Sequence, residues 1–141
     1  MRSVLTLVTL GVADVSRARA FYTALGWRAA AGSSAEVVFL HGVGTALGLW
    51  SRTLLAADSG VEQDTGGWGG ITLAHNVGSP AEVDAVLEQA REVGGRVVRA
   101  GATTEWGGYS GVFADPDEHR WEVAHNPFWP LAEDGRSVLP D

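Results

Sequence analysis

The sequence predicts an α+β fold built from two similar halves, each with the order strand, helix, strand, strand, strand. This order of elements occurs twice, over about 65 residues each time, which indicates an internal repeat. Each half also has a helix start near its beginning, at Asp14 and at Ser79. A third observation is a hairpin late in the chain, whose second strand carries Glu122 between two residues typical of a core.

Composition and charge narrow the class of protein. The 141 residues carry a formal net charge of −7, from 17 acidic and 10 basic residues, and this balance argues against nucleic-acid and anionic-membrane partners. The chain has no cysteine, which excludes disulfides, thiolate metal sites and a thiol nucleophile. The length of 141 residues suits one domain. Because no signal-peptide pattern and no apolar run of about 18 residues occurs, we expect a cytoplasmic protein.

The first module is expected at about 3–51. Its first strand, over 3–12, is β-branched and apolar, as in strands buried on both faces. Asp14 is the N-cap candidate of a helix that Gly26 closes. Three short strands, over 27–31, 35–41 and 45–50, complete the module. A crossover is expected over 52–69, in which Thr53 to Ala57 could form one helical turn.

The second module, at about 70–127, repeats this order. Its helix begins with a capping box, in which Ser79 is the N-cap, Pro80 is the first helical residue and Glu82 stands three residues after the cap. Strands are expected over 70–77, 96–100, 109–115 and 118–126. Residues 128–141 form a C-terminal tail.

The last hairpin is the most informative stretch. Asp115-Pro116-Asp117 predicts its turn, because Pro sets φ at the second position and Asp at the first position bonds back to the backbone. Alternation then places Trp121 and Val123 on one face of the next strand and Glu122 on the other. The run from Phe113 to Val123, Phe-x-Asp-Pro-Asp-x-His-x-Trp-Glu-Val, resembles the last hairpin of the vicinal oxygen chelate superfamily.

That superfamily includes glyoxalase I, extradiol dioxygenases, fosfomycin-resistance transferases and bleomycin-resistance proteins. The resemblance covers 3–127 and implies two βαβββ modules whose mixed and antiparallel sheets bend into a cup, the glyoxalase/bleomycin-resistance/dioxygenase fold. It also implies metal ligands on the first and last strand of each module. These four positions fall on Leu7, Gly48, Thr72 and Glu122 in this sequence.

Only one of these four residues is a good ligand, because leucine and glycine have no donor and threonine rarely ligates. The four histidines do not replace the missing ligands. By alternation His75 and His125 face away from Thr72 and Glu122, His41 ends a strand, and His119 lies at the turn. We therefore expect no metal cofactor. The alternative is a divalent metal at a site that a strand bulge restores.

Alternation also predicts the cup lining, which is mostly small or apolar and suits an aromatic or apolar ligand. The expected lining residues are Leu5, Leu7, Thr9, Ala46, Gly48, Trp50, Thr72, Ala74, Asn76, Ser110, Val112, Ala114, Arg120, Glu122 and Ala124. The candidate ligand-binding residues are Trp50, Thr72, Trp106, Tyr109, Ser110, Val112 and Glu122.

Each candidate also has a purely structural interpretation. Glu122 could pair with Arg120, Ser110 or Thr72, or be the remnant of a lost metal site. The aromatic residues Trp68, Trp106 and Tyr109, in or beside glycine-rich loops, could be hydrophobic plugs at the mouth of the cup.

Two further features carry expectations. Relatives often have glycine where this chain has Glu118, so a positive φ there would strain the backbone. The apolar tail residues Phe128, Trp129 and Leu131 are expected to cover the core or a homodimer interface, and the chain beyond Glu133 is expected to fray.

Two functions remain open on the sequence alone. The first is a metal-free protein that sequesters a small molecule, similar to bleomycin-resistance proteins. The second is a lyase, isomerase or dioxygenase-type enzyme in which Glu122 is a metal ligand or a general base.

Overall fold

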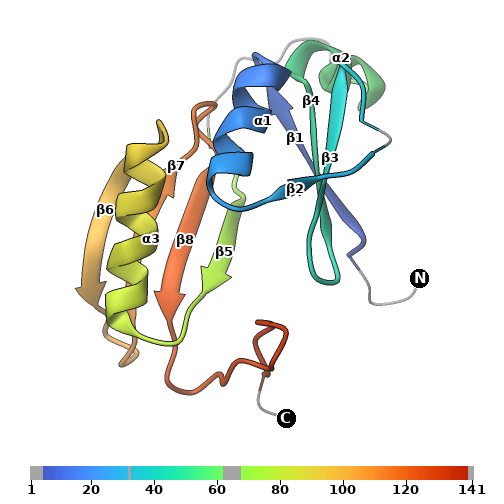
Figure 1. Ribbon diagram of the computed structural model, residues 1–141. Helices are drawn as coiled ribbons and strands as arrows, with labels where there is room; N and C mark the ends of the chain where they lie inside the picture. Colours follow the sequence, from blue (N-terminus) through green and yellow to red (C-terminus); the bar gives the residue numbers. More distant parts are fainter. Residues whose placement is uncertain (1–4, 32, 62–67, 140–141) are drawn as a thin grey trace. The chain divides into compact units, whose positions relative to one another are not determined.

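The structure is a computed structural model, and it describes residues 5–31, 33–61 and 68–139 (Figure 1). The chain divides into two compact units, Met1–Gly67 and Trp68–Asp141. The division lies inside the stretch that the sequence predicts as a crossover. No helix among the described residues is long and apolar enough to cross a membrane.

The first unit contains a four-stranded sheet with the strand order β1-β4-β3-β2. β1 pairs with β4 in parallel, and the other two pairs are antiparallel. Its elements in chain order are β1 (Leu7–Val12), α1 (Val15–Ala24), β2 (Arg28–Ala29), β3 (Val37–His41), β4 (Ala46–Ser51) and α2 (Arg52–Asp58).

The second unit contains a sheet of the same design, with the order β5-β8-β7-β6 and one parallel pair, β5 with β8. Its elements are β5 (Thr72–Asn76), α3 (Pro80–Glu92), β6 (Arg96–Thr103), β7 (Tyr109–Ala114) and β8 (Arg120–His125). The predicted α+β fold with two βαβββ modules is therefore confirmed.

Both predicted helix starts are confirmed by their caps. The Asp14 side chain accepts a hydrogen bond from the Arg17 backbone N–H at 2.9 Å, and Ser79 accepts one from the Glu82 N–H at 3.3 Å. The Glu82 carboxylate in turn accepts from the Gly78 N–H at 2.9 Å, one residue before the expected partner. These bonds satisfy backbone donors that the first helical turn leaves unpaired.

Strand register confirms the internal repeat residue by residue. Leu7 pairs with Ala46 at the start of β1 and β4, as Thr72 pairs with Arg120 at the start of β5 and β8. Two residues further along β4 and β8 stand Gly48 and Glu122. Gly48 therefore occupies in the first unit the position that Glu122 occupies in the second.

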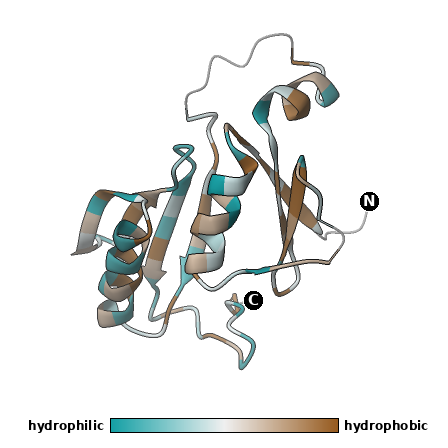
Figure 2. Ribbon diagram, turned by 45° about the horizontal axis from the view of Figure 1, so that its top comes forward, coloured by the Kyte–Doolittle hydropathy of each residue, from teal (hydrophilic) through white to brown (hydrophobic). Residues whose placement is uncertain are grey.

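The core of each unit lies between its sheet and its helix. In the first unit, the fully buried strand residues include Val12, Leu40 and Leu49. The buried residues of α1 include Phe21 and Tyr22. In the second unit, Val83, Leu87 and Ala90 of α3 are buried beside the sheet, and α3 shows alternating hydrophilic and hydrophobic positions (Figure 2). Burial of this kind stabilises each unit by roughly 25 cal/mol per Å² of apolar surface.

Some boundaries differ from the expectation. α2 has seven residues rather than a single turn, and β6 extends to Thr103 through two register shifts. The tail does not fray directly after Glu133, because Leu131 and Ser137 form a β-bridge and the Val138 N–H donates to the Pro130 carbonyl at 2.8 Å. The prediction of a frayed end was wrong there, because backbone hydrogen bonds do not require a recognisable pattern of side chains.

Gly111 marks the face of the second sheet that α3 covers. A Cβ atom at Gly111 would overlap the Leu87 side chain of α3 and would lie 2.9 Å from the Arg99 carbonyl oxygen. At Gly48 the closest atom to an added Cβ is the Thr9 hydroxyl, at 3.2 Å. Gly111 thus has no room for a methyl group, whereas Gly48 needs only a small shift of the Thr9 side chain.

We predict that Gly111→Ala lowers the free energy of unfolding by about 1–3 kcal/mol, because the added methyl meets the backbone as well as Leu87. Gly48→Ala is the control, with an expected loss below about 1 kcal/mol, since the Thr9 side chain can rotate away. Urea denaturation measures both. Equal losses for the two variants would contradict the assignment of faces.

Candidate functional site

Glu122 lies on the sheet face of the second unit that α3 does not cover. Val123 is fully buried and pairs with Gly111, which faces Leu87 of α3, so Glu122 and its neighbour Val112 point to the opposite side. Glu122 pairs with Ala74 on β5 and with Val112 on β7. We call this surface the Glu122 face, with Thr72, Ala74, Asn76, Ser110, Val112, Ala114, Arg120, Glu122 and Ala124 as its residues.

This set reproduces the second-unit part of the lining that alternation predicts, because the observed register contains no slip between β5, β8 and β7. In the first unit, Gly48 shares a face with Thr9 and Leu7, which would be the neighbours of an added Cβ. Trp50 is two residues further along β4 and half-buried, so alternation places it on the same face. The cup formed by both faces stays a prediction, since each unit is described by itself.

Each protein partner that the sequence offers to Glu122 is bound to another residue. The Arg120 guanidinium donates to the Glu118 carboxylate at 2.7 Å. The Ser110 hydroxyl accepts from Arg99 at 2.9 Å, and the Thr72 hydroxyl accepts from the Trp68 indole N–H at 3.4 Å. Within the described part of the chain, the Glu122 carboxylate therefore has no hydrogen bond or ion pair.

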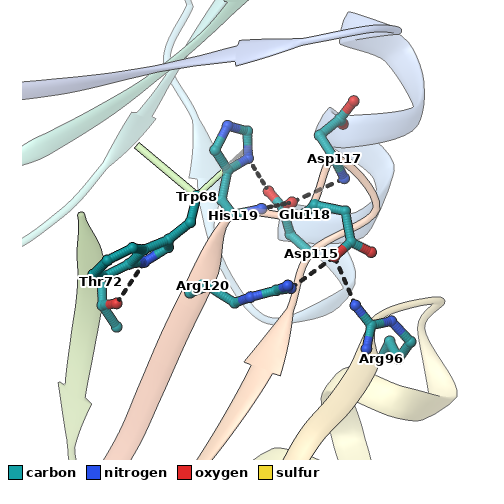
Figure 3. A network of polar contacts seen from close by, with 8 residues as sticks. All are labelled: Trp68, Thr72, Arg96, Asp115, Asp117, Glu118, His119 and Arg120. Carbon is teal, nitrogen blue, oxygen red and sulfur yellow. Dashed lines mark hydrogen bonds and ion pairs between the residues drawn. The ribbon is translucent and has the colours of Figure 1, made fainter. Parts of the chain in front are cut away.

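Glu118 connects two arginines at the edge of this face. Arg96 and Arg120 approach one carboxylate oxygen of Glu118, at 2.6 Å and 2.7 Å, from different strands (Figure 3). Hydrogen bonds from Arg120 and then from Arg96 hold the pKa of the Glu118 carboxyl below its usual value. Because the pKa falls on folding, this contribution to stability is present at neutral pH and is lost as the pH falls through the lowered pKa.

The turn before β8 follows the predicted chemistry. The buried Asp115 carboxylate accepts from the Asp117 and His119 backbone N–H groups, both at 2.9 Å, and lies 2.8 Å from His119 Nδ1. Glu118 closes the turn with φ of 70°, and it is the one non-glycine residue of the described chain with positive φ. The sequence-based concern about this position is thus confirmed, and the strain is on the order of 1 kcal/mol.

None of the histidines shares the Glu122 face. His125 pairs with Tyr109 and has Nδ1 3.3 Å from the Val77 carbonyl oxygen, whereas His75 pairs with the helix-covered Val123. His119 is bound by Asp115 at the turn. His41 belongs to the first unit, where it ends β3 opposite Arg28.

The residues present do not fit the metal site that the resemblance implies. Leu7 and Gly48 carry no donor atom, and in the second unit Thr72 and Glu122 offer one hydroxyl and one carboxylate. Across residues 5–31, 33–61 and 68–139, no three histidine, aspartate or glutamate side chains group so that they could hold a metal ion. A stable site for zinc or iron needs about three protein ligands.

The aromatic candidates Tyr109 and Trp106 lie in different surroundings. Tyr109 lies on the α3 side, where its hydroxyl donates to Asp84 at 3.1 Å, so it does not share the face of Glu122. Tyr109 begins the strand that the sequence predicts over 109–115, and alternation along β7 places it opposite to Ser110 and Val112. Burial, followed by the bond to Asp84, raises the pKa of the Tyr109 hydroxyl.

Trp106 lies in the turn between β6 and β7, about half exposed. Its indole covers Gly108, where any Cβ would overlap the ring, and the neighbouring Gly107 faces the ring of Phe128. Trp106 therefore has structural contacts of its own, and its role as a plug at the mouth of the cup stays a prediction.

Trp68 is a contact that the candidate set misses. Its exposed indole N–H donates a hydrogen bond to the Thr72 hydroxyl at the start of β5 (Figure 3). Thr72 in turn pairs with Arg120 on the Glu122 face. The sequence signal for this contact was the spacing of four residues between Trp68 and Thr72. The ion pairs of Glu118 and the bond from Arg99 to Ser110 were not predicted, because they depend on register and on side-chain direction.

Comparisons of the sequence and of the structure with known proteins point to the same family. A family model described as the Glyoxalase/Bleomycin resistance protein/Dioxygenase superfamily matches residues 4–123. A solved glyoxalase-related enzyme from Fulvimarina pelagi is 34% identical, with a TM-score of 0.90 and 99% of both chains covered. No curated protein matches the chain.

Two more distant structures share the fold. One is a glyoxalase/bleomycin resistance protein/dioxygenase family enzyme from Burkholderia phytofirmans PsJN, with 19% identity, a TM-score of 0.79, and 87% of this chain and 98% of that chain covered. The other is a lactoylglutathione lyase from Agrobacterium tumefaciens, with 21% identity, a TM-score of 0.67, and 92% and 98% covered.

We predict that Glu122→Gln changes the free energy of unfolding by less than about 0.5 kcal/mol, because its carboxylate bonds no described residue. Asp115→Ala is the comparison, with an expected loss of about 2–4 kcal/mol, since it leaves one buried and one half-buried backbone N–H, and the His119 ring, without their acceptor. Chemical denaturation at pH 7 measures both. A large loss for Glu122→Gln would make that residue structural.

Proposed function

Because the chain belongs to the Glyoxalase/Bleomycin resistance protein/Dioxygenase superfamily, we propose that it binds a small aromatic or apolar molecule on the Glu122 face without a metal. The observation that supports this is the half-buried Glu122 carboxylate, whose candidate partners Arg120, Ser110 and Thr72 are each bound elsewhere. A half-buried acceptor needs donors from water or from a ligand.

The surroundings of Glu122 define the ligand. Ala74 and Val112 flank it on the neighbouring strands, and Ala124 follows it on β8, so the surface beside the carboxylate is small and apolar. A flat apolar body fits such a surface, and an amine or hydroxyl group of the ligand supplies the donor for Glu122. The net charge of −7 favours a cationic donor by steering.

This chemistry fits sequestration, in which the molecule is held and not converted. The protein is proposed to act in the cytoplasm as a homodimer. Support for the dimer comes from exposed apolar side chains in the tail, with Phe128 64% and Trp129 36% exposed.

An enzyme that uses Glu122 as a general base is the second candidate. The same observation favours it, because a carboxylate without a protein partner is free to accept a proton from a bound substrate. The 34% identical structure from Fulvimarina pelagi is described as a glyoxalase-related enzyme. Turnover of a bound ligand, lost in Glu122→Gln while binding remains, would favour this candidate over sequestration.

Three naphthalene compounds that differ in charge test the binding proposal: 1-naphthylmethylamine, 1-naphthylmethanol and 1-naphthylacetate. We predict that the wild-type protein binds the amine most tightly and the acetate least, because Glu122 accepts from the first and repels the last. In Glu122→Gln the amine should lose about tenfold in affinity, roughly 1.4 kcal/mol, while the alcohol changes little. Calorimetry measures the affinities. Equal affinities of wild type and variant for the amine would contradict the proposal.

We also predict that the purified protein contains far less than one equivalent of zinc, iron, nickel or manganese. The reason is the donor set, in which Leu7 and Gly48 cannot ligate. Elemental analysis measures the content, and thermal unfolding with each added metal measures binding. Stoichiometric metal, or stabilisation near the 2.7 kcal/mol expected at about 100 times the Kd, would contradict it.

A further inference from the structure

We propose that Glu118 is a positioning residue that holds Arg120 away from Glu122 and so keeps the Glu122 carboxylate available to a ligand. The inference rests on the proposed function, in which Glu122 binds the donor group of the ligand. It assigns a role to a residue at the edge of the Glu122 face that does not itself contact the ligand.

The first argument is the distance between Arg120 and Glu122. They are two residues apart on β8, so they lie on the same face, with Cα atoms roughly 6–7 Å apart at the normal rise of a strand. An arginine side chain can span this distance to a carboxylate. The structure shows Arg120 turned to Glu118 instead, at 2.7 Å, and Glu122 without a described partner.

The second argument is that Glu118 is itself held in place. Arg96 on β6 donates to the same carboxylate oxygen that Arg120 contacts, so two guanidinium groups fix Glu118 from two strands (Figure 3). The Arg120 side chain is 26% exposed, against 57% for Arg96. Arg120, which Glu118 holds away from Glu122, is therefore the better buried of the two arginines. Two arginines that share one carboxylate form a network, which is stronger than an isolated surface ion pair.

The third argument is the backbone of Glu118. Its φ of 70° is a conformation that glycine adopts without strain and that strains residues with a Cβ atom. Strain of this kind persists where the surrounding structure holds it, and it gathers at functional sites. Glycine at 118 would remove the strain but also the carboxylate, so the side chain explains why this position tolerates a strained residue.

Loss of the Glu118 carboxylate therefore releases Arg120 toward Glu122. A cationic ligand then competes with an arginine that is already present on the same strand, whereas a neutral ligand loses little. Removal of Arg120 as well should restore the free carboxylate. This rescue separates positioning from a structural role, because a second substitution does not repair a damaged fold.

The test measures binding of 1-naphthylmethylamine and 1-naphthylmethanol to Glu118→Gln, Glu118→Gly and the double variant Glu118→Gln with Arg120→Gln. We expect both single variants to lose about tenfold in affinity for the amine and less than about twofold for the alcohol. The double variant should return to within about threefold of the wild type. Unchanged amine binding in both single variants, or no recovery in the double variant, would overturn the inference.

Crystal structures of the ligand-free wild type and of Glu118→Gln supply a readout that needs no ligand. We expect the Arg120 guanidinium within about 4 Å of the Glu122 carboxylate in the variant only. If Arg120 moves so but the wild type binds no amine, the proposed function fails and the positioning role stands. If the amine binds through Glu122 and Arg120 stays in place in the variant, the positioning role fails and the function stands.

Discussion

The packing of β8 against α3 determines the sheet face to which Glu122 and its neighbours on β7 and β5 point. Val123 is fully buried beside Gly111, Trp121 is 7% exposed, and the Trp121 and Phe113 rings stack in parallel with centroids 6.1 Å apart. Burying such side chains is worth about 1.5–3 kcal/mol each. Because strand residues alternate, this burial sends Glu122 to the other face, and a one-residue slip would reverse both faces at once.

The turn before β8 secures that register, and the strain at Glu118 is its consequence. Asp115 uses its carboxylate on the backbone N–H groups of Asp117 and His119, which fixes the path of the chain from β7 into β8. The same path requires φ of 70° at Glu118. Its side chain then emerges between Arg96 and Arg120, so the geometry that sets the register also sets the ion pairs at the edge of the Glu122 face.

The fold could be predicted from the sequence because its signals are local. Helix caps, the Asp-Pro-Asp turn and hydrophobic alternation each lie within a few residues, and they gave the element order and the face of Glu122. The absence of a described partner for Glu122 could not be predicted, since alternation gives the face of Arg120, Ser110 and Thr72 but not the partner that each side chain binds. The short hairpin of the tail was missed because backbone hydrogen bonds between 130 and 138 leave no side-chain pattern. Tyr109 was named as a ligand contact because it stands beside a glycine-rich loop, although alternation along its own predicted strand separates it from Ser110 and Val112.

The repeat explains how one fold can keep its frame while its chemistry changes. The frame depends on residues that face the helices, and these are apolar in both units. The residues at the repeated positions Leu7, Gly48, Thr72 and Glu122 lie outside that constraint, so their donors can be lost without loss of the core. Gly48 and Glu122 occupy equivalent positions, yet one has no side chain and the other has a carboxylate. A metal ion needs about three protein ligands, and Glu122 supplies one. One carboxylate is enough to accept a hydrogen bond from the donor group of a small molecule. The residues at the four repeated positions therefore favour direct ligand binding over a metal site.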